Sequence, residues 1–247
     1  ASDVYKRQGY YGGMPKLNLK NPEVEKFITD VACYWIRECD IDGWRMDVGD
    51  EISHFFWKNF RKAVKAVKKD MLIIGEIWHY AGDFLEGDEW DTVMNYPFYL
   101  NMIDLLADEK ITVSQFIQNL GYLKGRLNKK CYPLMWNLID SHDTARFLHL
   151  CKNNKKKQHL AAAFQLLLPG MPMIYYGDEF AMPGANDPDC RRGMYWDEEY
   201  QDKEMFEWYK QLQKVRKNHA CIVEGEPIEI AARDEEETIV LTRKNGE

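Results

Sequence analysis

Three carboxylic acids, Asp47, Glu76 and Asp143, stand at the ends of three apolar runs that are typical of β-strands. In an α/β barrel the C-terminal ends of the strands form the mouth of the active site, so acids placed there can point at a substrate. Carboxylates on neighbouring strand ends can approach to about 5 Å, the separation that retaining glycoside hydrolysis requires. The pattern therefore predicts a nucleophile and an acid/base drawn from these acids.

Neighbouring residues give two of these acids different expected roles. Arg45 precedes Asp47 by two positions and so lies on the same side of the strand. An adjacent guanidinium favours the ionised carboxylate, as a nucleophile needs. Glu76 is followed by Ile77 and Trp78, and an apolar surrounding would raise its pKa, as a proton donor needs.

Two other interpretations of these residues stay open at this point. Arg45 and Asp47 could be a structural ion pair at a strand end. The three acids could also bind a divalent cation, since carboxylate oxygens are preferred ligands of Mg²⁺. Nearby cationic or polar side chains disfavour the metal because they would compete with it; these are Arg45, His79, His142 and Arg146.

Strands and helices alternate along the chain. Strand patterns are expected near 43–47, 71–79, 92–97, 134–139 and 173–176. Helices are expected near 22–38, 53–69, 113–127, 156–168 and 198–216. Apolar residues recur at helical spacing in the first helix (Val24, Phe27, Ile28, Val31, Trp35) and on the expected inner face of the second (Phe56, Phe60, Val64, Val67). Such alternation predicts a parallel sheet.

The predicted fold class is α/β: the C-terminal portion of a (β/α)8 barrel followed by the start of an all-β sandwich domain. Acids at three strand ends favour a barrel over an open sheet, and five strands cannot close a barrel of eight. Residues 1–8 are expected to be a scar or disordered, 9–219 to hold about strands 4–8, and 220–247 to begin the β domain with no helix. A strand at 238–243 precedes the hairpin-turn pair Asn245-Gly246, so we expect a fragment of a longer protein.

Composition limits the function classes. The net charge of −7 argues against nucleic-acid or anionic-membrane binding. No apolar run approaches the roughly 18 residues of a membrane helix. Six cysteines are scattered without a Cys-x-x-Cys pair, which suits free thiols and a cytoplasmic location. The eight Trp and fourteen Tyr are a weak hint of sugar binding.

Five motifs resemble the α-amylase family (glycoside hydrolase family 13) in that family's order. The segments 43–47 (GWRMD), 75–79 (GEIWH) and 141–143 (SHD) are similar to its nucleophile, acid/base and third-acid motifs. The segments 170–179 (GMPMIYYGDE) and 187–196 resemble its last strand and the following loop. The segments 14–18 (MPKLN) and 76–79 (EIWH) are similar to those of the neopullulanase, cyclomaltodextrinase and maltogenic amylase subgroup.

The resemblance implies a retaining hydrolase of α-1,4 and perhaps α-1,6 bonds in cyclodextrins, pullulan, starch or maltooligosaccharides. It implies Asp47 as nucleophile, Glu76 as acid/base and Asp143 as transition-state stabiliser, with Arg45 orienting Asp47. Further substrate contacts are expected at His142, His79, Trp78, Asn95, Tyr96, Arg146, Asp187, Arg191 and Arg192, whereas Asp178 and Glu179 are expected to be structural. A transglycosylase, a non-catalytic relative or an inactive fragment are the alternatives.

The resemblance also bears on cofactors and partners. No cofactor or metal is required, although calcium is compatible with the complete parent. The expected partner is an α-glucan or cyclodextrin substrate, and the parent is compatible with a homodimer. An upstream Asp-x-x-x-Asn-His motif of the family is absent from the chain, and its Asp and His would complete the −1 subsite.

Overall fold

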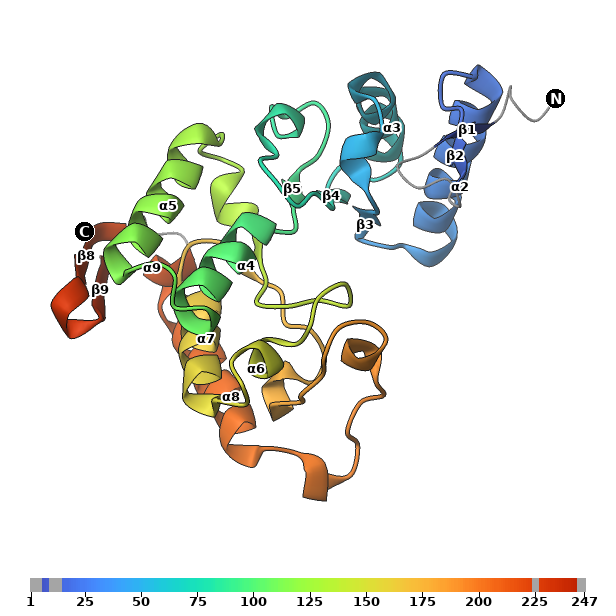
Figure 1. Cartoon of the computed structure of the whole chain (residues 1–247). Coiled ribbons are helices and arrows are strands. Elements are labelled where there is room, and N and C mark those ends of the chain that lie inside the picture. The colour runs from blue at the N-terminus through green and yellow to red at the C-terminus, as the bar shows by residue number, and fades with distance from the viewer. Residues whose placement is uncertain (1–5, 9–14, 224–226, 244–247) are drawn as a thin grey trace. The chain divides into compact units, whose positions relative to one another are not determined.

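The computed structural model describes residues 6–8, 15–223 and 227–243 (Figure 1). Its contacts divide the chain into two compact units, Ala1–Met94 and Asn95–Glu247. Helices alternate with short parallel strands in both units, which confirms the predicted α/β class. Among the described helices, none has the length and apolar character needed to cross a membrane.

The first unit contains a parallel sheet of order β3-β4-β5 and an antiparallel pair β1-β2. Its elements are β1 (Lys6–Gln8), β2 (Pro15–Leu17), α2 (Pro22–Cys39), β3 (Gly43–Met46), η1 (Gly49–Glu51), α3 (His54–Val67), β4 (Leu72–Gly75), η2 (Gly82–Phe84) and β5 (Thr92–Val93). Residues 1–8 were expected to be a scar or disordered; within them the structure describes β1, which pairs with β2.

Local sequence explains where the two helices of this unit begin. The side chain of Asn21 accepts a hydrogen bond from Glu23 N at 2.9 Å, and Pro22 occupies the first turn. Ser53 accepts from Phe56 N in the same way and starts α3. Phe56, Phe60 and Val64 of α3 are buried as predicted, with Trp57 beside them.

The apolar residues at helical spacing in α2 are not all buried. Val24 is buried, but Phe27, Val31 and Trp35 are exposed, with 64%, 38% and 45% of their surface accessible. The other buried residues of the helix are Ala32, Cys33 and Ile36. Apolar residues occur on more than one side of this helix, and periodicity alone does not say which side packs.

A buried tryptophan fixes the ends of β3 and β4. Trp90 is fully buried and stacks on Phe84 with ring centroids 4.1 Å apart. A Cβ atom at Gly75 would lie 2.3 Å from the Trp90 ring, and one at Gly49 would lie 2.6 Å from it. Glycine at both positions therefore allows the indole to pack directly under the strand ends.

The second unit contains the parallel pair β6-β7 and the antiparallel hairpin β8-β9. Its helices are α4 (Tyr96–Met102), the π-helix η3 (Ile103–Ala107), α5 (Val113–Arg126), η4 (Tyr132–Leu134), α6 (Phe147–Leu150), α7 (Lys155–Leu167), η5 (Asp178–Phe180), η6 (Asp189–Arg191), η7 (Glu198–Tyr200), α8 (Lys203–Asn218), α9 (Ala220–Val223) and η8 (Asp234–Glu236). Its strands are β6 (Trp136–Asn137), β7 (Met171–Pro172), β8 (Pro227–Arg233) and β9 (Thr238–Arg243).

Two strand predictions fail in detail. The expected strand near 92–97 ends after Val93, because the Asn95 side chain accepts from Phe98 N and starts α4 with Pro97 in its first turn. The expected strand near 173–176 is displaced: β7 is Met171–Pro172, paired in parallel with β6. Gln165 explains the end of that ladder, because its side-chain amide donates to Met173 O at 2.6 Å.

Two apolar clusters hold the helices of the second unit together. One joins α4, α5, α6 and α7, and the other joins α6, α7 and α8. Ile239 and Leu241 of β9 pack on the first cluster, and Ser114 N donates to the Asp234 side chain at 2.8 Å.

The end of the chain departs from its predicted description in one respect. The strand prediction at 238–243 is confirmed. A short helix, α9, stands where no helix was expected after residue 220. Asn245-Gly246 lies outside the described residues.

Candidate active site

In the first unit, two of the predicted acids follow residues that are paired between neighbouring strands. β3 and β4 are parallel, and Met46 is the partner of Gly75. Asp47 and Glu76 each follow directly, so both leave the sheet at the C-terminal edge of neighbouring strands. Their environments differ: 76% of the Asp47 side chain is accessible, whereas Glu76 is buried with 5% of its surface accessible.

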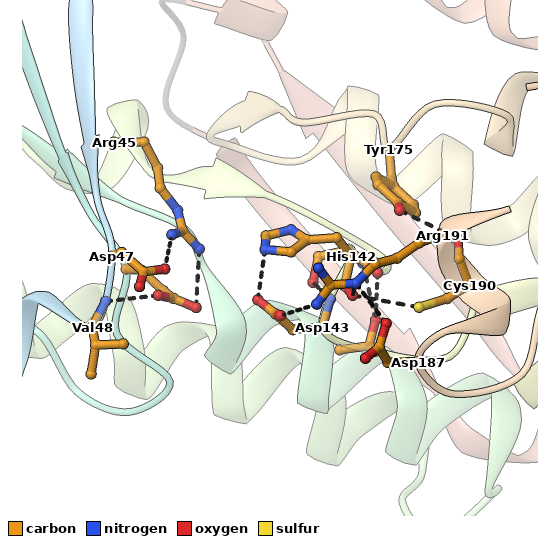
Figure 2. A network of polar contacts seen from close by, with 12 residues as sticks. Arg45, Asp47, Val48, His142, Asp143, Tyr175, Asp187, Cys190 and Arg191 are labelled. Carbon is orange, nitrogen blue, oxygen red and sulfur yellow. Dashed lines mark hydrogen bonds and ion pairs between the residues drawn. The ribbon is translucent and has the colours of Figure 1, made fainter. Parts of the chain in front are cut away.

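Arg45 contacts both carboxylates (Figure 2). Its Nη1 forms an ion pair with Asp47 Oδ1, as the sequence predicted. Its Nη2 lies 3.1 Å from Glu76 Oε1, a contact that the sequence did not predict. One guanidinium therefore fixes the two acids relative to each other.

The backbone of Val48 supplies a third contact to this pair. Val48 N donates to Glu76 Oε2 at 2.8 Å. Val48 has a φ of 46°, a left-handed conformation that is strained for a β-branched residue. This strained turn aims the amide at the carboxylate.

Two further predicted residues lie at the same strand end. The indole nitrogen of Trp78 donates to Glu76 Oε1 at 3.4 Å, and 41% of the Trp78 surface is accessible. His79 Nδ1 lies 3.8 Å from Asp50 Oδ2 and its side chain is exposed. The structure thus brings together Arg45, Asp47, Glu76 and Trp78, with His79 beside Asp50.

The second unit holds the third predicted acid in a separate network (Figure 2). His142 Nε2 lies 3.0 Å from Asp143 Oδ2. Arg191 contacts both residues: Nη2 lies 3.2 Å from Asp143 Oδ1, and Nε donates to His142 O at 2.9 Å. Asp187 Oδ1 forms an ion pair with the same arginine, 2.7 Å from its Nε. All four residues were predicted as site residues, and the structure brings them together.

Hydrogen bonds from buried side chains hold the loop that carries Asp143. Ser141 Oγ accepts from Asp143 N at 3.1 Å and lies 3.1 Å from the hydroxyl of Tyr96. Thr144 Oγ1 accepts from Ser141 N at 3.0 Å. These bonds determine how the Asp143 side chain leaves the loop.

The structure buries three side chains that the sequence analysis expected to contact substrate. Tyr96 is fully buried against Ser141. Asn95 is 3% accessible, starts α4 and donates to Asn137 Oδ1 at 2.9 Å. Arg146 has no accessible surface. All three support the loops and strand ends from inside.

Arg146 belongs to a buried cluster with two acids. Its Nη1 donates to Tyr176 O at 2.8 Å and lies 3.4 Å from Asp178 Oδ1. Asp140 Oδ2 accepts from Phe147 N at 2.7 Å. Burial raises the pKa of Asp140 to about 6, and burial together with the adjacent Asp140 carboxyl raises the pKa of Asp178 well above its usual value.

Sequence reasoning missed three contributors to these networks. Val48, whose amide takes part, follows Asp47 directly, and Asp50 follows it by three residues. No sequence signal reveals a left-handed valine. The third contributor is Asp140, which directly precedes Ser141. An acid that ends the apolar run Leu138–Ile139 was the available signal, because a buried acid requires partners.

Metal ligation finds no support in the described ranges. In residues 6–8, 15–223 and 227–243, no group of three or more His, Cys, Asp or Glu side chains is placed to hold an ion. The carboxylates of the two networks are occupied by arginine and histidine instead.

Comparison with known proteins agrees with this chemistry. Residues 1–201 match the family described as Alpha amylase, catalytic domain. The chain is 46% identical over 233 residues to a cyclomaltodextrinase of Geobacillus thermopakistaniensis (strain MAS1), covering 94% of this chain and 40% of that protein. It is also 46% identical over 224 residues to an intracellular maltogenic amylase of Bacillus subtilis, covering 90% of this chain and 38% of that protein.

A solved structure of a cyclomaltodextrinase gives the same result at the level of the fold. This chain superposes on that structure with a TM-score of 0.93 at 40% identity. The match covers 97% of this chain and 41% of the cyclomaltodextrinase chain. The chain therefore spans about 40% of the length of these relatives. Since the family match extends over most of its residues, this chain belongs to the α-amylase family.

Proposed function

We propose that the chain is part of a retaining glycoside hydrolase acting on α-1,4 bonds, and on α-1,6 bonds as well, in cyclodextrins, pullulan, starch or maltooligosaccharides. The observation that carries the proposal is the register of β3 and β4, which sends Asp47 and Glu76 from adjacent strand ends. Retaining hydrolysis needs two such carboxylates. Two relatives are named cyclomaltodextrinase and maltogenic amylase, which supports the substrate class.

In the first step Glu76 protonates the glycosidic oxygen while Asp47 attacks the anomeric carbon. The bond between that carbon and the leaving oxygen breaks, and a glycosyl ester of Asp47 forms. The exposure of Asp47 and the burial of Glu76 suit this division, since the nucleophile must reach the sugar. Arg45 forms an ion pair with the Asp47 carboxylate and orients it.

In the second step Glu76, now a base, removes a proton from water, which attacks the same carbon and releases Asp47. Two inversions at one centre leave the anomeric configuration unchanged. Asp143 and His142 bond hydroxyls of the reacting sugar and stabilise the positive charge that develops on the ring. Arg191 holds both residues in place.

The outer contacts follow from exposure. Trp78 and His79 are accessible at the first-unit site, and Asp187 and Arg191 are accessible at the second. We assign these four residues to sugar contacts. An exposed indole such as that of Trp78 offers an apolar face to a pyranose ring.

The finer statements about the whole protein belong to the same proposal. The described strands form about strands 4–8 of a (β/α)8 barrel, and the β8-β9 hairpin begins a β-sandwich domain. A cytoplasmic location is supported by six free cysteines and by the relative named intracellular. Calcium binding and a homodimer are compatible with the complete enzyme.

The test is made on the full-length enzyme with maltooligosaccharides and cyclodextrins. Asp47→Asn and Glu76→Gln should each lower kcat by at least about 10³-fold, because each removes a reacting group. Asp30→Asn is the matched control, since Asp30 forms an exposed ion pair with Lys26 on the surface of α2. Wild-type turnover in either active-site variant would refute the assigned roles.

A second measurement identifies the nucleophile and the reaction type. A fluorinated glycosyl trap should label Asp47, which peptide mass spectrometry can locate. Product analysis then separates hydrolysis from transfer to another sugar. Labelling of a different carboxylate, or no labelling of an active enzyme, would contradict the mechanism.

A further inference from the structure

Beneath the loop that carries His142 and Asp143, the second unit buries two acids and only one arginine. Asp140, Arg146 and Asp178 have 0%, 0% and 1% of their surface accessible. The backbone joins them to the site directly, since Asp140 precedes Ser141 and Arg146 follows Asp143 by three residues. Two ionised acids beside one cation would leave a net negative charge without solvent, which is very unfavourable.

Hydrogen-bond geometry shows how this charge is avoided. Asp140 Oδ2 accepts from Phe147 N at 2.7 Å, and Asp178 Oδ1 faces Arg146 Nη1 at 3.4 Å. The other oxygen of each carboxyl, Asp140 Oδ1 and Asp178 Oδ2, is buried and has no donor among the described residues. The two carboxyl groups contact each other within hydrogen-bonding range. Arg146 Nε and Nη2 are also buried without a hydrogen-bond partner among the described residues, so the arginine does not reach these two oxygens. A single proton between the two carboxyls would supply a donor there.

We propose that Asp140 and Asp178 share one proton and, with Arg146, form a neutral buried clamp that positions the Ser141–Asp143 loop. Asp140 fixes the start of the loop through Phe147 N, and Arg146 ties its end to Tyr176 O. Asp178 joins the two. These are positioning residues, since none of them is accessible to a sugar.

Other titratable groups around the clamp do not replace the shared proton. Tyr175 and Tyr176 place their rings 4.5 and 4.9 Å from the Arg146 guanidinium. Tyr209 of α8 is buried nearby, and Cys190 lies next to the same arginine. Glu179 is a further negative charge near Asp178 and does not stabilise an ionised Asp178. Its own Oε2 accepts a hydrogen bond from Gly177 N. No second cation acts on the pair in the part of the chain that the structure describes.

The clamp predicts a specific pH dependence of stability. Burial raises the pKa of Asp140 to about 6 and that of Asp178 further, so the pair titrates as a unit. The folded protein then binds a proton that the unfolded chain releases near pH 4. Its stability is fully present below about pH 4 and falls as the pH rises through and beyond 6, by up to about tenfold in the folding equilibrium constant per pH unit.

The first experiment measures the thermal midpoint against pH. Asp140→Asn and Asp178→Asn each supply an amide donor in place of the proton, so both should lose this slope relative to wild type. Asp30→Asn, on the exposed face of α2, should keep it. Infrared spectra of the wild-type protein at neutral pH should show the C=O band of a protonated carboxyl. An unchanged slope in both variants, or the absence of the band, overturns the shared proton.

The second experiment tests positioning, and it rests on the proposed hydrolysis. Asp140→Ala should lower kcat by about 10²-fold with little change in KM, because the loop that holds Asp143 is displaced. Asp140→Asn keeps an acceptor for Phe147 N and should recover most of that loss. Equal kcat values for the two variants overturn the positioning role. If the wild-type enzyme cleaves no α-glucan, the proposed function is refuted. The pH dependence of the thermal midpoint still tests whether Asp140 and Asp178 share a proton.

Discussion

Two clusters in this chain are worth comparing because each places one arginine against two acids. In the first unit Arg45 stands between Asp47 and Glu76. In the second, Arg146 stands beside Asp178 and Asp140. The two clusters differ in solvent accessibility. Asp47 is largely exposed, whereas every member of the second cluster is buried. Water therefore reaches Asp47 of the first, open cluster, although Glu76 there is buried, while the second, closed cluster must keep a proton.

Exchanging each arginine for methionine is the strongest test of this contrast. Arg146→Met should destabilise the protein by about 3–5 kcal/mol, because it leaves buried carboxyl groups without a cation. Arg45→Met should lower stability by only about 1–2 kcal/mol, because Val48 N still holds Glu76 and Asp47 stays hydrated. Chemical denaturation of the two variants measures both values.

Activity should separate the two arginines in the opposite way. Arg45→Met should lower kcat by about 10²- to 10³-fold in protein that remains folded, because Arg45 orients both reacting acids. Arg146→Met should lose activity in proportion to the folded protein that remains. A well-folded Arg146→Met variant, or a fully active Arg45→Met variant, would show that the two clusters do not differ as argued.

The sequence predicted the open cluster far better than the closed one. Asp47 and Glu76 end apolar strands, and Arg45 lies at the alternate position of its strand, so the β period alone aligned them. Arg146 was expected among the substrate contacts as a cationic neighbour of Asp143, but it has no accessible surface. Its burial depends on Tyr175, Tyr176 and Asp178, which lie about thirty residues away in the sequence.

The same distinction applies to the elements. Helices with a cap and a proline at the start, such as α2, were predicted to within a residue or two. The strands β6 and β7 have two residues each. Their bounds are determined by hydrogen bonds from Gln165 and Asn137 side chains, which no local pattern contains. Asn95 and Tyr96 were taken for site residues because the helix they start was not recognised.

A smaller change should perturb the open cluster through its support. Gly75→Ala places a Cβ against the Trp90 ring, where the available gap is 2.3 Å. The tryptophan is fully buried and cannot move freely, so we expect a loss of about 1–3 kcal/mol. Because Glu76 follows directly, kcat should fall as well. Gly121→Ala is the control, since a Cβ there meets no atom within 4 Å; equal effects of the two would contradict the packing argument.

Val48 tests whether the open cluster uses a backbone amide or a side chain. Val48→Gly removes the strain of a left-handed valine, which should stabilise the fold by about 1–2 kcal/mol. Glycine also loses more chain entropy on folding, which should destabilise the fold by about 0.5–1 kcal/mol. The net change in stability should therefore stay below about 1 kcal/mol, and activity should persist because the amide to Glu76 remains. Val48→Asn should behave alike, since asparagine tolerates this conformation. Denaturation curves and kcat measure both effects. A large loss of kcat with unchanged stability would instead assign the half-exposed Val48 side chain to the substrate, and the strained turn would then serve to present that side chain rather than to orient the acid.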